Sequence, residues 1–254
     1  MIDTHCHLYS SEFEEDIKAV LDRAQTAGVS RFYLPAIDST THHRMIALQE
    51  TFKGICFAMI GLHPCSVKED YENELNIIEK LLQQHSFAAI GETGLDFYWD
   101  TSFKDAQYKA LEKQIELALQ YNLPLVLHTR NALPQTIDVI KNFSQTPLKG
   151  IFHCFGGSLN EAEQIIACNF LLGIGGVVTY KNSGLDNILP HINLKYMVLE
   201  TDAPYLSPVP YRGKRNESCY LTEVVKKIAA LKKVSVDEVI NITSENAEKL
   251  FGKN

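Results

Sequence analysis

Several features that mark other classes of protein are missing from this chain. It has six cysteines but no Cys-x-x-Cys pair, which argues against a zinc finger or a dithiol redox motif. No apolar run approaches the ~20 residues that span a bilayer, and the first residues lack the basic and apolar pattern of a signal peptide. We therefore expect a cytoplasmic protein with reduced cysteines and no membrane partner.

Positive charge is also scarce in this sequence. Lysine and arginine number 24 against 31 aspartates and glutamates, which gives a net charge of −7. A protein that binds nucleic acid through a broad charged surface is usually basic. If this protein handles phosphates, its positive charge must come from bound metals and from a few well-placed side chains.

Eight short apolar segments have the composition of strands, and most are separated by segments with helical periodicity. Clean alternation of apolar and polar residues is absent from them, as expected of parallel strands buried on both faces. The predicted strands are Met1–His5, Ser30–Leu34, Ile55–Ile60, Phe87–Gly91, Pro124–His128, Gly150–His153, Phe170–Ile174 and Tyr196–Glu200. The predicted helices include Asp16–Ala27, Ser102–Tyr121, Leu159–Cys168, Leu221–Leu231 and one or two helices within Val236–Phe251.

This order of elements predicts a (β/α)₈ TIM barrel, because eight βα repeats fit a single domain of 254 residues. The rival fold is a doubly wound open sheet. Against it, the chain has no Gly-x-Gly-x-x-Gly motif, which would mark the phosphate-binding turn of a dinucleotide-binding sheet.

Candidate metal ligands stand at the ends of the predicted strands. His5 and His7 are two residues apart, so in an extended strand they point to the same side, where two imidazoles can share an ion. Other histidines and acids occupy matching positions later in the chain: Glu92, His128, His153 and Asp202. The carboxyl ends of barrel strands meet at one active site. The sequence therefore predicts a metal site with four imidazoles and two carboxylates.

Six ligand residues exceed what one catalytic ion with an open position needs. Two divalent ions bridged by Glu92 fit the set better, and the mixture of nitrogen and oxygen suits Mg, Mn or Zn. Two ions about 3.5–4 Å apart can clamp an in-line phosphoryl displacement. We expect Glu92 and Asp202 to be catalytic, Asp202 as the acceptor of the proton of the attacking water. Glu200 shares the face of Asp202 and is expected to support the ligands from behind.

Basic residues gather near the same predicted end of the barrel. Arg130 follows His128, while Lys214 and Arg215 lie in a proline-punctuated loop after Asp202. Their position above a metal site that attracts anions predicts contacts with substrate phosphates. The alternative is that this loop is only a solvated rim.

Two further segments are candidates for contacts with substrate. His63 follows the third predicted strand and is expected to contact substrate, with a supporting role or a simple turn histidine as alternatives. Phe97, Tyr98 and Trp99 follow Glu92 and offer flat surfaces on which bases could stack, although packing at the rim explains them equally well.

Taken together, these motifs make the chain similar to the TatD family of metal-dependent deoxyribonucleases, within the amidohydrolase-like barrels. The resemblance spans nearly the whole chain. It rests on Asp3-Thr4-His5-Cys6-His7, Gly61-Leu62-His63-Pro64, Ala89-Ile90-Gly91-Glu92-Thr93-Gly94-Leu95-Asp96, Pro124-Leu125-Val126-Leu127-His128, His153-Cys154-Phe155-Gly156-Gly157, Glu200-Thr201-Asp202-Ala203-Pro204-Tyr205-Leu206 and Arg212-Gly213-Lys214-Arg215-Asn216-Glu217. One departure is visible, because Ser218-Cys219 follows that last block where the family commonly has Pro.

The resemblance implies a single TatD-like barrel hydrolase domain over residues 1–254. It implies divalent-metal-dependent hydrolysis of phosphodiester bonds in DNA. The leading interpretation is a DNA exonuclease on single-stranded or frayed ends or an endonuclease, and RNA stays open as a further substrate. The implied ligands share Glu92 and are His5, His7, Glu92 and Asp202 for one ion, and Glu92, His128 and His153 for the other. No obligate protein partner is inferred.

Two other functions stay open at this point. One is a related metal-dependent hydrolase of amides or esters, such as an aminoacyl-tRNA deacylase, since the same chemistry could act on a carbonyl. The other is a non-catalytic nucleic-acid binder, whose mark would be an incomplete set of metal ligands.

Overall fold

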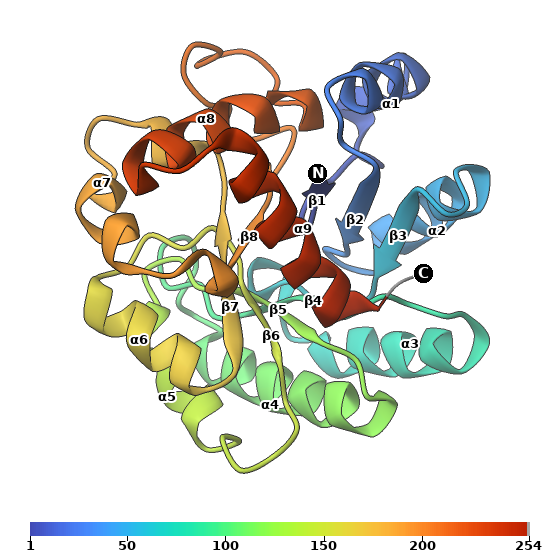
Figure 1. Ribbon diagram of the computed structural model, residues 1–254. Coiled ribbons are helices and arrows are strands. Elements are labelled where there is room, and N and C mark those ends of the chain that lie inside the picture. The colour runs from blue at the N-terminus through green and yellow to red at the C-terminus, as the bar shows by residue number, and fades with distance from the viewer. Residues whose placement is uncertain (253–254) are drawn as a thin grey trace.

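The computed structural model describes residues 1–252 and shows eight parallel strands that alternate with helices around a closed barrel (Figure 1). The strands are β1 (Ile2–Asp3), β2 (Arg31–Pro35), β3 (Cys56–Met59), β4 (Ile90–Gly94), β5 (Leu125–His128), β6 (Gly150–Phe152), β7 (Phe170–Ile174) and β8 (Met197–Leu199). The helices are α1 (Ile17–Thr26), α2 (Ser39–Thr51), α3 (Tyr71–Gln84), α4 (Lys104–Tyr121), α5 (Leu133–Lys141), α6 (Leu159–Ala167), α7 (Leu185–Ile188), α8 (Leu221–Lys232) and α9 (Val236–Phe251). The predicted barrel is confirmed.

Two seams close the barrel. Backbone pairing joins β1 to β3 in one sheet and β4 to β8 in another. A bridge between Ile60 and Ile90 connects the two sheets at one seam. At the other seam Cys6 pairs with Ala203, and the N–H of Thr4 donates to the carbonyl of Leu199 over 2.9 Å. The extension of β1 therefore lies directly beside the end of β8.

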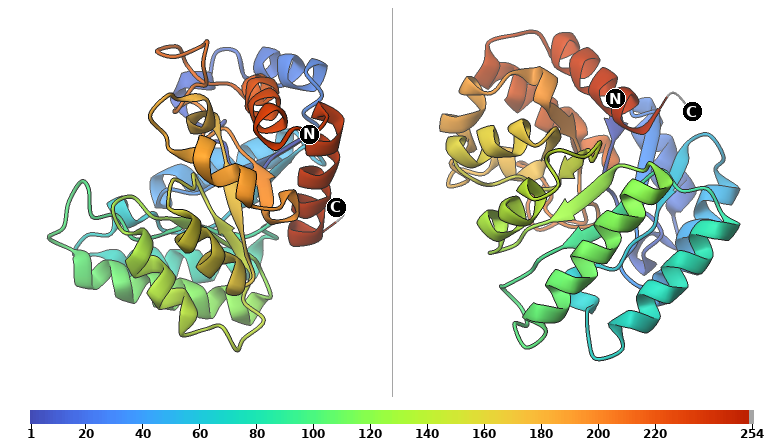
Figure 2. Two further views of the ribbon diagram at one scale, coloured as in Figure 1. Left: turned by 60° about the vertical axis from the view of Figure 1, so that its left-hand side comes forward. Right: turned by 90° about the horizontal axis from the view of Figure 1, so that it is seen from below.

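One end of the barrel is filled with apolar side chains. This layer contains Ile2, Tyr33, Met59, Ala89, Val126, Ile151 and Val198. The last turns of α9 pack beneath it, and the ring of Phe251 stacks on Tyr33 with centroids 3.9 Å apart. Figure 2 shows α9 at this end and, at the opposite end, the loops that follow the strands. A functional site is therefore expected at the opposite end of the barrel, at the carboxyl-terminal ends of the strands.

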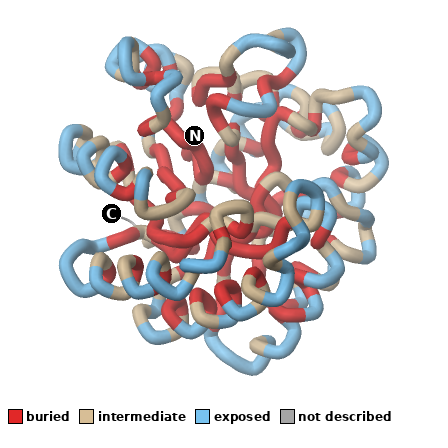
Figure 3. Tube along the Cα trace, turned by 180° about the vertical axis from the view of Figure 1, so that it is seen from behind, coloured by how far each residue is buried: buried red, intermediate tan, exposed pale blue. Residues whose placement is uncertain are grey.

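Burial follows the layers of the barrel. In Figure 3 the strands are buried, whereas the outer faces of the surrounding helices and the loops are exposed. The strands carry apolar residues on both faces, since one face meets the barrel interior and the other meets the helices. Within residues 1–252, no helix combines the length and the apolar character needed to cross a membrane.

The fourth strand differs from its prediction, which was Phe87–Gly91 with Glu92 just beyond it. In the structure Glu92 lies inside β4. The pairing register with β5 shifts between Ile90 and Thr93. Such an irregularity re-aims a side chain, and sequence periodicity does not reveal it. Side chains of a regular strand alternate between its two faces. Counted from the inward-facing Ala89, that alternation would turn Glu92 away from the barrel interior, whereas the register shift turns it inward.

Candidate metal centre

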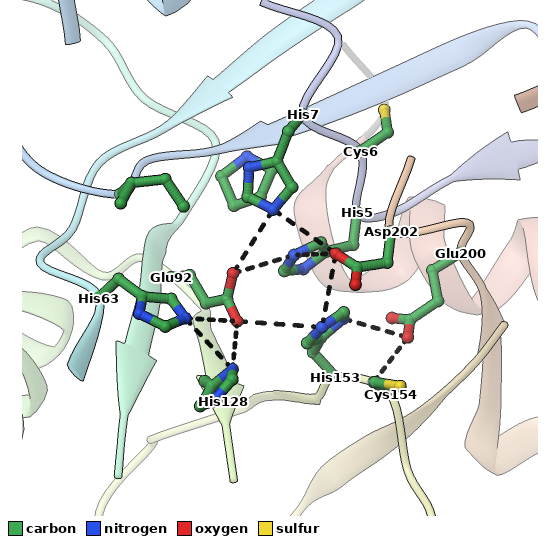
Figure 4. A network of polar contacts seen from close by, with 12 residues as sticks. His5, Cys6, His7, His63, Glu92, His128, His153, Cys154, Glu200 and Asp202 are labelled. Carbon is green, nitrogen blue, oxygen red and sulfur yellow. Dashed lines mark hydrogen bonds and ion pairs between the residues drawn. The ribbon is translucent and has the colours of Figure 1, made fainter. Parts of the chain in front are cut away.

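The first two candidate ligands stand on the extension of β1. The N–H of Asp202 donates to the carbonyl of His5 over 2.9 Å, and the N–H of His7 donates to the carbonyl of Ala203 over 2.7 Å. This short ladder places the imidazoles of His5 and His7 beside the carboxylate of Asp202 (Figure 4). The segments that follow the first and the last strand thus meet in one site, because the barrel closes there.

Glu92 is buried at the centre of the site and divides the histidines between its two oxygens (Figure 4). Its Oε2 lies 3.1 Å from Nε2 of His5 and 3.7 Å from Nε2 of His7. Its Oε1 lies 2.9 Å from Nδ1 of His128 and 3.9 Å from Nε2 of His153. One carboxylate therefore faces candidate histidine ligands with both of its oxygens, as a bridging ligand does, and His63 also lies 3.6 Å from Oε1.

Asp202 lies close to histidines from two sides of the site. Its Oδ1 lies 3.5 Å from Nε2 of His7 and 3.8 Å from Nε2 of His153. Its backbone has a φ of 59°, in the left-handed region that Asp tolerates better than most residues. The side chain is 16% exposed, against 3% for Glu92, so Asp202 is the more accessible of the two carboxylates.

The hydrogen bonds of His7 determine which of its nitrogens faces the site. The hydroxyl of Tyr9 donates to the carbonyl of Pro35 over 2.6 Å, so it must accept the proton of Nδ1 of His7, 3.0 Å away. This leaves Nε2 with a free lone pair directed at Glu92 and Asp202. An imidazole whose Nε2 faces two carboxylates in this way is oriented to bind a metal ion.

Two buried carboxylates orient the other histidines in the same way. Oδ2 of Asp96 lies 2.8 Å from Nε2 of His128, and Oε1 of Glu200 lies 3.1 Å from Nδ1 of His153. Carboxylates behind metal-bound histidines commonly hold the ring in this way. The structure thus places the carboxylate of Glu200 beside His153, and its supporting role stays a prediction. Asp96 was missed, because it stands in a turn beyond β4 where strand alternation carries no information.

The electrostatics of the site favour a bound cation. Burial alone would raise the pKa of Glu92, but the surrounding imidazoles, led by His5 and His63, outweigh burial and hold it well below its usual range. Burial opposes protonation of His153, yet Glu200, Glu92 and Asp202 raise its pKa to about 10. Glu92 therefore stays ionised, and the space beside its carboxylate suits positive charge.

His5 provides a further indication of bound metal. It is completely buried, and within residues 1–252 neither of its ring nitrogens makes a hydrogen bond. Buried polar atoms are nearly always partnered, so an unpaired Nε2 beside two carboxylates indicates a site for an ion. The nitrogen and oxygen donors fit Mg, Mn or Zn. The residues present therefore fit the divalent ions that the sequence predicts.

His63 lies beside these groups, with its ring turned for a different role. Its Nε2 lies 3.3 Å from Nδ1 of His128 and 3.6 Å from Oε1 of Glu92. Its Nδ1 accepts the N–H of Cys65 over 3.1 Å, at the start of a short 3₁₀ turn. Burial, reinforced by His128, lowers the pKa of His63 to about 3, so the ring is neutral. Its single proton then sits on Nε2, which makes His63 a donor rather than a ligand.

The site opens into a pocket of about 1500 Å³. The pocket contains His63, Arg130 and Asp202, and it continues along residues 129–135 after β5. Arg130, predicted to contact substrate, is therefore placed in the pocket with the candidate ligands.

Residues 2–252 match the model of the family described as TatD related DNase. The chain belongs to the TatD family. The resemblance inferred from the sequence motifs is thereby confirmed.

TatD relatives resemble this chain along its full length. It is 37% identical over 252 residues to the uncharacterized metal-dependent hydrolase YabD of Bacillus subtilis, with 99% of this chain and 98% of that protein covered. It is 32% identical over 258 residues to a protein of Pectobacterium atrosepticum named 3′-5′ ssDNA/RNA exonuclease TatD, with 99% of each covered. The crystal structure of the TatD homologue YjjV of Escherichia coli superposes with a TM-score of 0.93 at 30% identity, covering 99% and 97% of the two chains.

Arg215 of this TatD-family chain, predicted from the sequence to contact a phosphate, lies outside the residues that line the pocket. Its guanidinium lies 2.8 Å from Asp16 and 2.9 Å from Glu217, over the ring of Phe13. Glu217 follows Arg215 closely in the sequence, but Asp16 lies just before α1. Only the folded chain brings Asp16 to this loop. Arg215 therefore ties the loop to the body of the protein. Lys214 is exposed on that loop and lies outside the residues that line the pocket.

Proposed function

We propose that this TatD-family protein is a divalent-metal-dependent phosphodiesterase that cleaves DNA as an exonuclease, on single-stranded or frayed ends, with RNA as a further substrate. The observation that carries the proposal is the division of four histidines between the two oxygens of Glu92, at the floor of an open pocket. The name of the Pectobacterium relative, an exonuclease of ssDNA and RNA, supports the choice of substrate.

The residues proposed to hold the two ions follow from that division. They share Glu92 and are His5, His7, Glu92 and Asp202 for one ion, and Glu92, His128 and His153 for the other. When bound, two divalent ions lower the pKa of a water molecule and neutralise charge on a phosphoryl group. All six residues converge in the structure, whereas a non-catalytic binder was expected to have an incomplete set.

Asp202 is proposed to receive the proton that the attacking water loses. Burial opposes its ionisation, but His153, followed by His7 and His5, lowers the pKa of Asp202, so a carboxylate is present to accept the proton. Among the carboxylates of the site, its side chain is 16% exposed, against 1% for Asp96 and for Glu200. It is therefore the one that water and substrate reach most easily.

His63 and Arg130 are proposed to bind the phosphates. The Nε2–H of His63 points toward Oε1 of Glu92 and offers a neutral donor to a phosphoryl oxygen beside the reacting centre. The guanidinium of Arg130 lies in the pocket and offers charged donors to a phosphate farther along the strand. Donors that act on the backbone carry no base information, so cleavage is expected with any sequence.

The proposal is tested by assaying the purified chain on single-stranded DNA, RNA and a small carboxylic ester in parallel. Chelation is expected to abolish DNA cleavage, and Mg²⁺, Mn²⁺ or Zn²⁺ to restore it. Glu92→Gln, which keeps the size of the side chain and removes its charge, is the matched inactive variant. Full turnover in a verified metal-free preparation overturns the proposal. Faster hydrolysis of the ester than of either nucleic acid favours the amide- or ester-hydrolase function instead.

A further inference from the structure

Two exposed aromatic side chains stand in the loop between β4 and α4. Tyr98 is 50% exposed and Trp99 is 67% exposed, the largest exposed fractions among the big apolar side chains of residues 1–252 apart from Tyr205 at 55%. Trp99 also lines the pocket that contains the candidate metal ligands. Figure 2 shows this loop projecting from the end of the barrel opposite α9. Adjoining exposed rings at the edge of a pocket indicate a binding surface.

The carboxylate of Asp96 holds this loop in place. Its Oδ1 accepts the N–H groups of Tyr98 over 2.9 Å and of Trp99 over 3.1 Å. Its Oδ2 lies 2.8 Å from Nε2 of His128. One buried side chain therefore orients a candidate metal ligand and sets the position of both rings. The backbone that carries the two rings is thus tied to the same carboxylate as a candidate metal ligand.

Arg130 lies against the same rings. Its guanidinium carbon is 3.8 Å from the ring centroid of Tyr98 and 5.1 Å from that of Trp99. The N–H of Phe97 donates to the carbonyl of Arg130 over 3.0 Å, which ties the two loops together. The rings of Tyr98 and Trp99 meet edge to face, with centroids 4.9 Å apart at 87°. Tyr98, Trp99 and Arg130 form a unit that we call the aromatic shelf.

The aromatic shelf has the two chemical properties that a nucleotide requires. A flat indole face is available to water and therefore to a stacking base. A guanidinium 3.8 Å from the ring centroid of Tyr98 keeps its charge and can donate to a phosphate oxygen. The guanidinium of Arg215, by contrast, is bound to two carboxylates and has no such freedom.

We propose that the aromatic shelf is a nucleotide subsite in which Trp99 stacks on an unpaired base next to the scissile phosphate and Arg130 contacts a neighbouring phosphate. This rests on the proposed nuclease function and adds the physical reason for a preference for single strands. A base inside a duplex is already stacked on both sides and cannot present a face to the indole. Every base has such a face, so the subsite is indifferent to sequence.

A kinetic experiment separates base stacking from binding of the backbone. The metal-loaded chain is assayed on an oligothymidylate and on a base-free sugar–phosphate oligomer of the same length. Trp99→Leu keeps apolar bulk but loses the ring, and it is expected to raise KM for the oligothymidylate about fivefold or more. The base-free oligomer should be cleaved as by the wild type. Trp99→Phe keeps an aromatic ring and is the matched control. Its KM for the oligothymidylate should stay close to the wild-type value. Equal effects on both substrates, or no effect on either, overturn the proposal.

Fluorescence tests the shelf independently of turnover. Trp99 is the only tryptophan of the chain, so its emission reports on the shelf alone. The wild-type chain is titrated with each oligomer in the presence of a chelator. Quenching by the oligothymidylate but not by the base-free oligomer supports the subsite, even if no substrate is cleaved and the proposed function fails. If neither oligomer quenches the emission, or if both quench it equally, the proposed nucleotide subsite is wrong. Neither outcome bears on whether the protein cleaves phosphodiesters.

Discussion

The backbone N–H of Cys65 donates to Nδ1 of His63 over 3.1 Å. This single hydrogen bond assigns the proton of the neutral ring to Nε2, the nitrogen that faces Glu92 and His128. His63 lies close enough to both of them to be counted among metal ligands by distance alone. The hydrogen bond instead favours a role as a donor, and we propose that its Nε2–H acts on the substrate.

The role of His63 is tested by His63→Asn, whose side-chain oxygen can still accept the N–H of Cys65 and cap the 3₁₀ turn. The variant loses the Nε2 donor, so we expect kcat on single-stranded DNA to fall by about 10²–10³. Metal content, measured by elemental analysis, should equal that of the wild type. A loss of one ion would show instead that His63 is a ligand.

Asp202→Asn separates chemistry from binding. The change preserves the shape of the side chain but removes its charge and basicity. We expect the cleavage rate to fall by at least ~10², the lower range for the loss of a general base. DNA affinity, measured by fluorescence anisotropy of a labelled strand, should change far less. Wild-type cleavage by this variant would mean that Asp202 is neither the base nor an essential ligand.

The positions of the basic residues predict different responses to salt. Removing one cationic partner of a single-strand phosphate flattens the slope of log affinity against log salt concentration by about 0.7. We expect this flattening for Arg130→Gln, because Arg130 lines the pocket. Arg215→Gln should leave the slope unchanged, because its guanidinium is bound to Asp16 and Glu217.

The contribution of Lys214, exposed on the same loop, stays a prediction. Lys214→Gln should flatten the slope as Arg130→Gln does if the loop reaches the DNA. Metal content should be intact in all three variants. Parallel slopes for Arg130→Gln and the wild type would contradict the placement of Arg130 on a phosphate, and a parallel slope for Lys214→Gln would identify the loop as a solvated rim.

The ion pairs of Glu217 should make the stability of the fold depend on pH. Arg23 lies 2.8 Å and Arg215 2.9 Å from its carboxylate. Burial opposes ionisation, but the two arginines outweigh it and lower the pKa of Glu217. A lowered pKa in the folded state stabilises the protein above the unfolded pKa, and this contribution disappears as the pH falls through the folded value.

We therefore expect Glu217→Gln to reduce the free energy of unfolding by about 1–2 kcal/mol near neutral pH. The difference from the wild type should narrow as the pH falls below the unfolded pKa of about 4.3, and it should be lost once the pH passes the lowered pKa of the folded carboxyl. Urea unfolding at a series of pH values measures both. Glu245→Gln is the matched control, because its contact with Lys249 is long and exposed and should matter little. A difference that stays constant with pH would contradict this account.

The division between sequence and structure is clear for the strands. Apolar runs and their spacing are local properties, so the order and approximate position of the strands could be predicted, although no bounds were predicted for helices α2, α3, α5 and α7. The bounds of β4 could not, because the shift between Ile90 and Thr93 arises from pairing with a neighbouring strand. That shift turns Glu92 into the barrel, where its oxygens face two pairs of histidines.

The sequence by itself determined the chemical inventory of the site: His5, His7, Glu92, His128, His153 and Asp202 at the ends of strands that a barrel must bring together. Only the tertiary structure decided the partner of each group. Asp96 supports His128 and the aromatic shelf, Cys65 directs the proton of His63, and Asp16 draws Arg215 away from the pocket. The physical reason is that hydrogen bonds and ion pairs join atoms from different loops, and their geometry exists only once the barrel has closed.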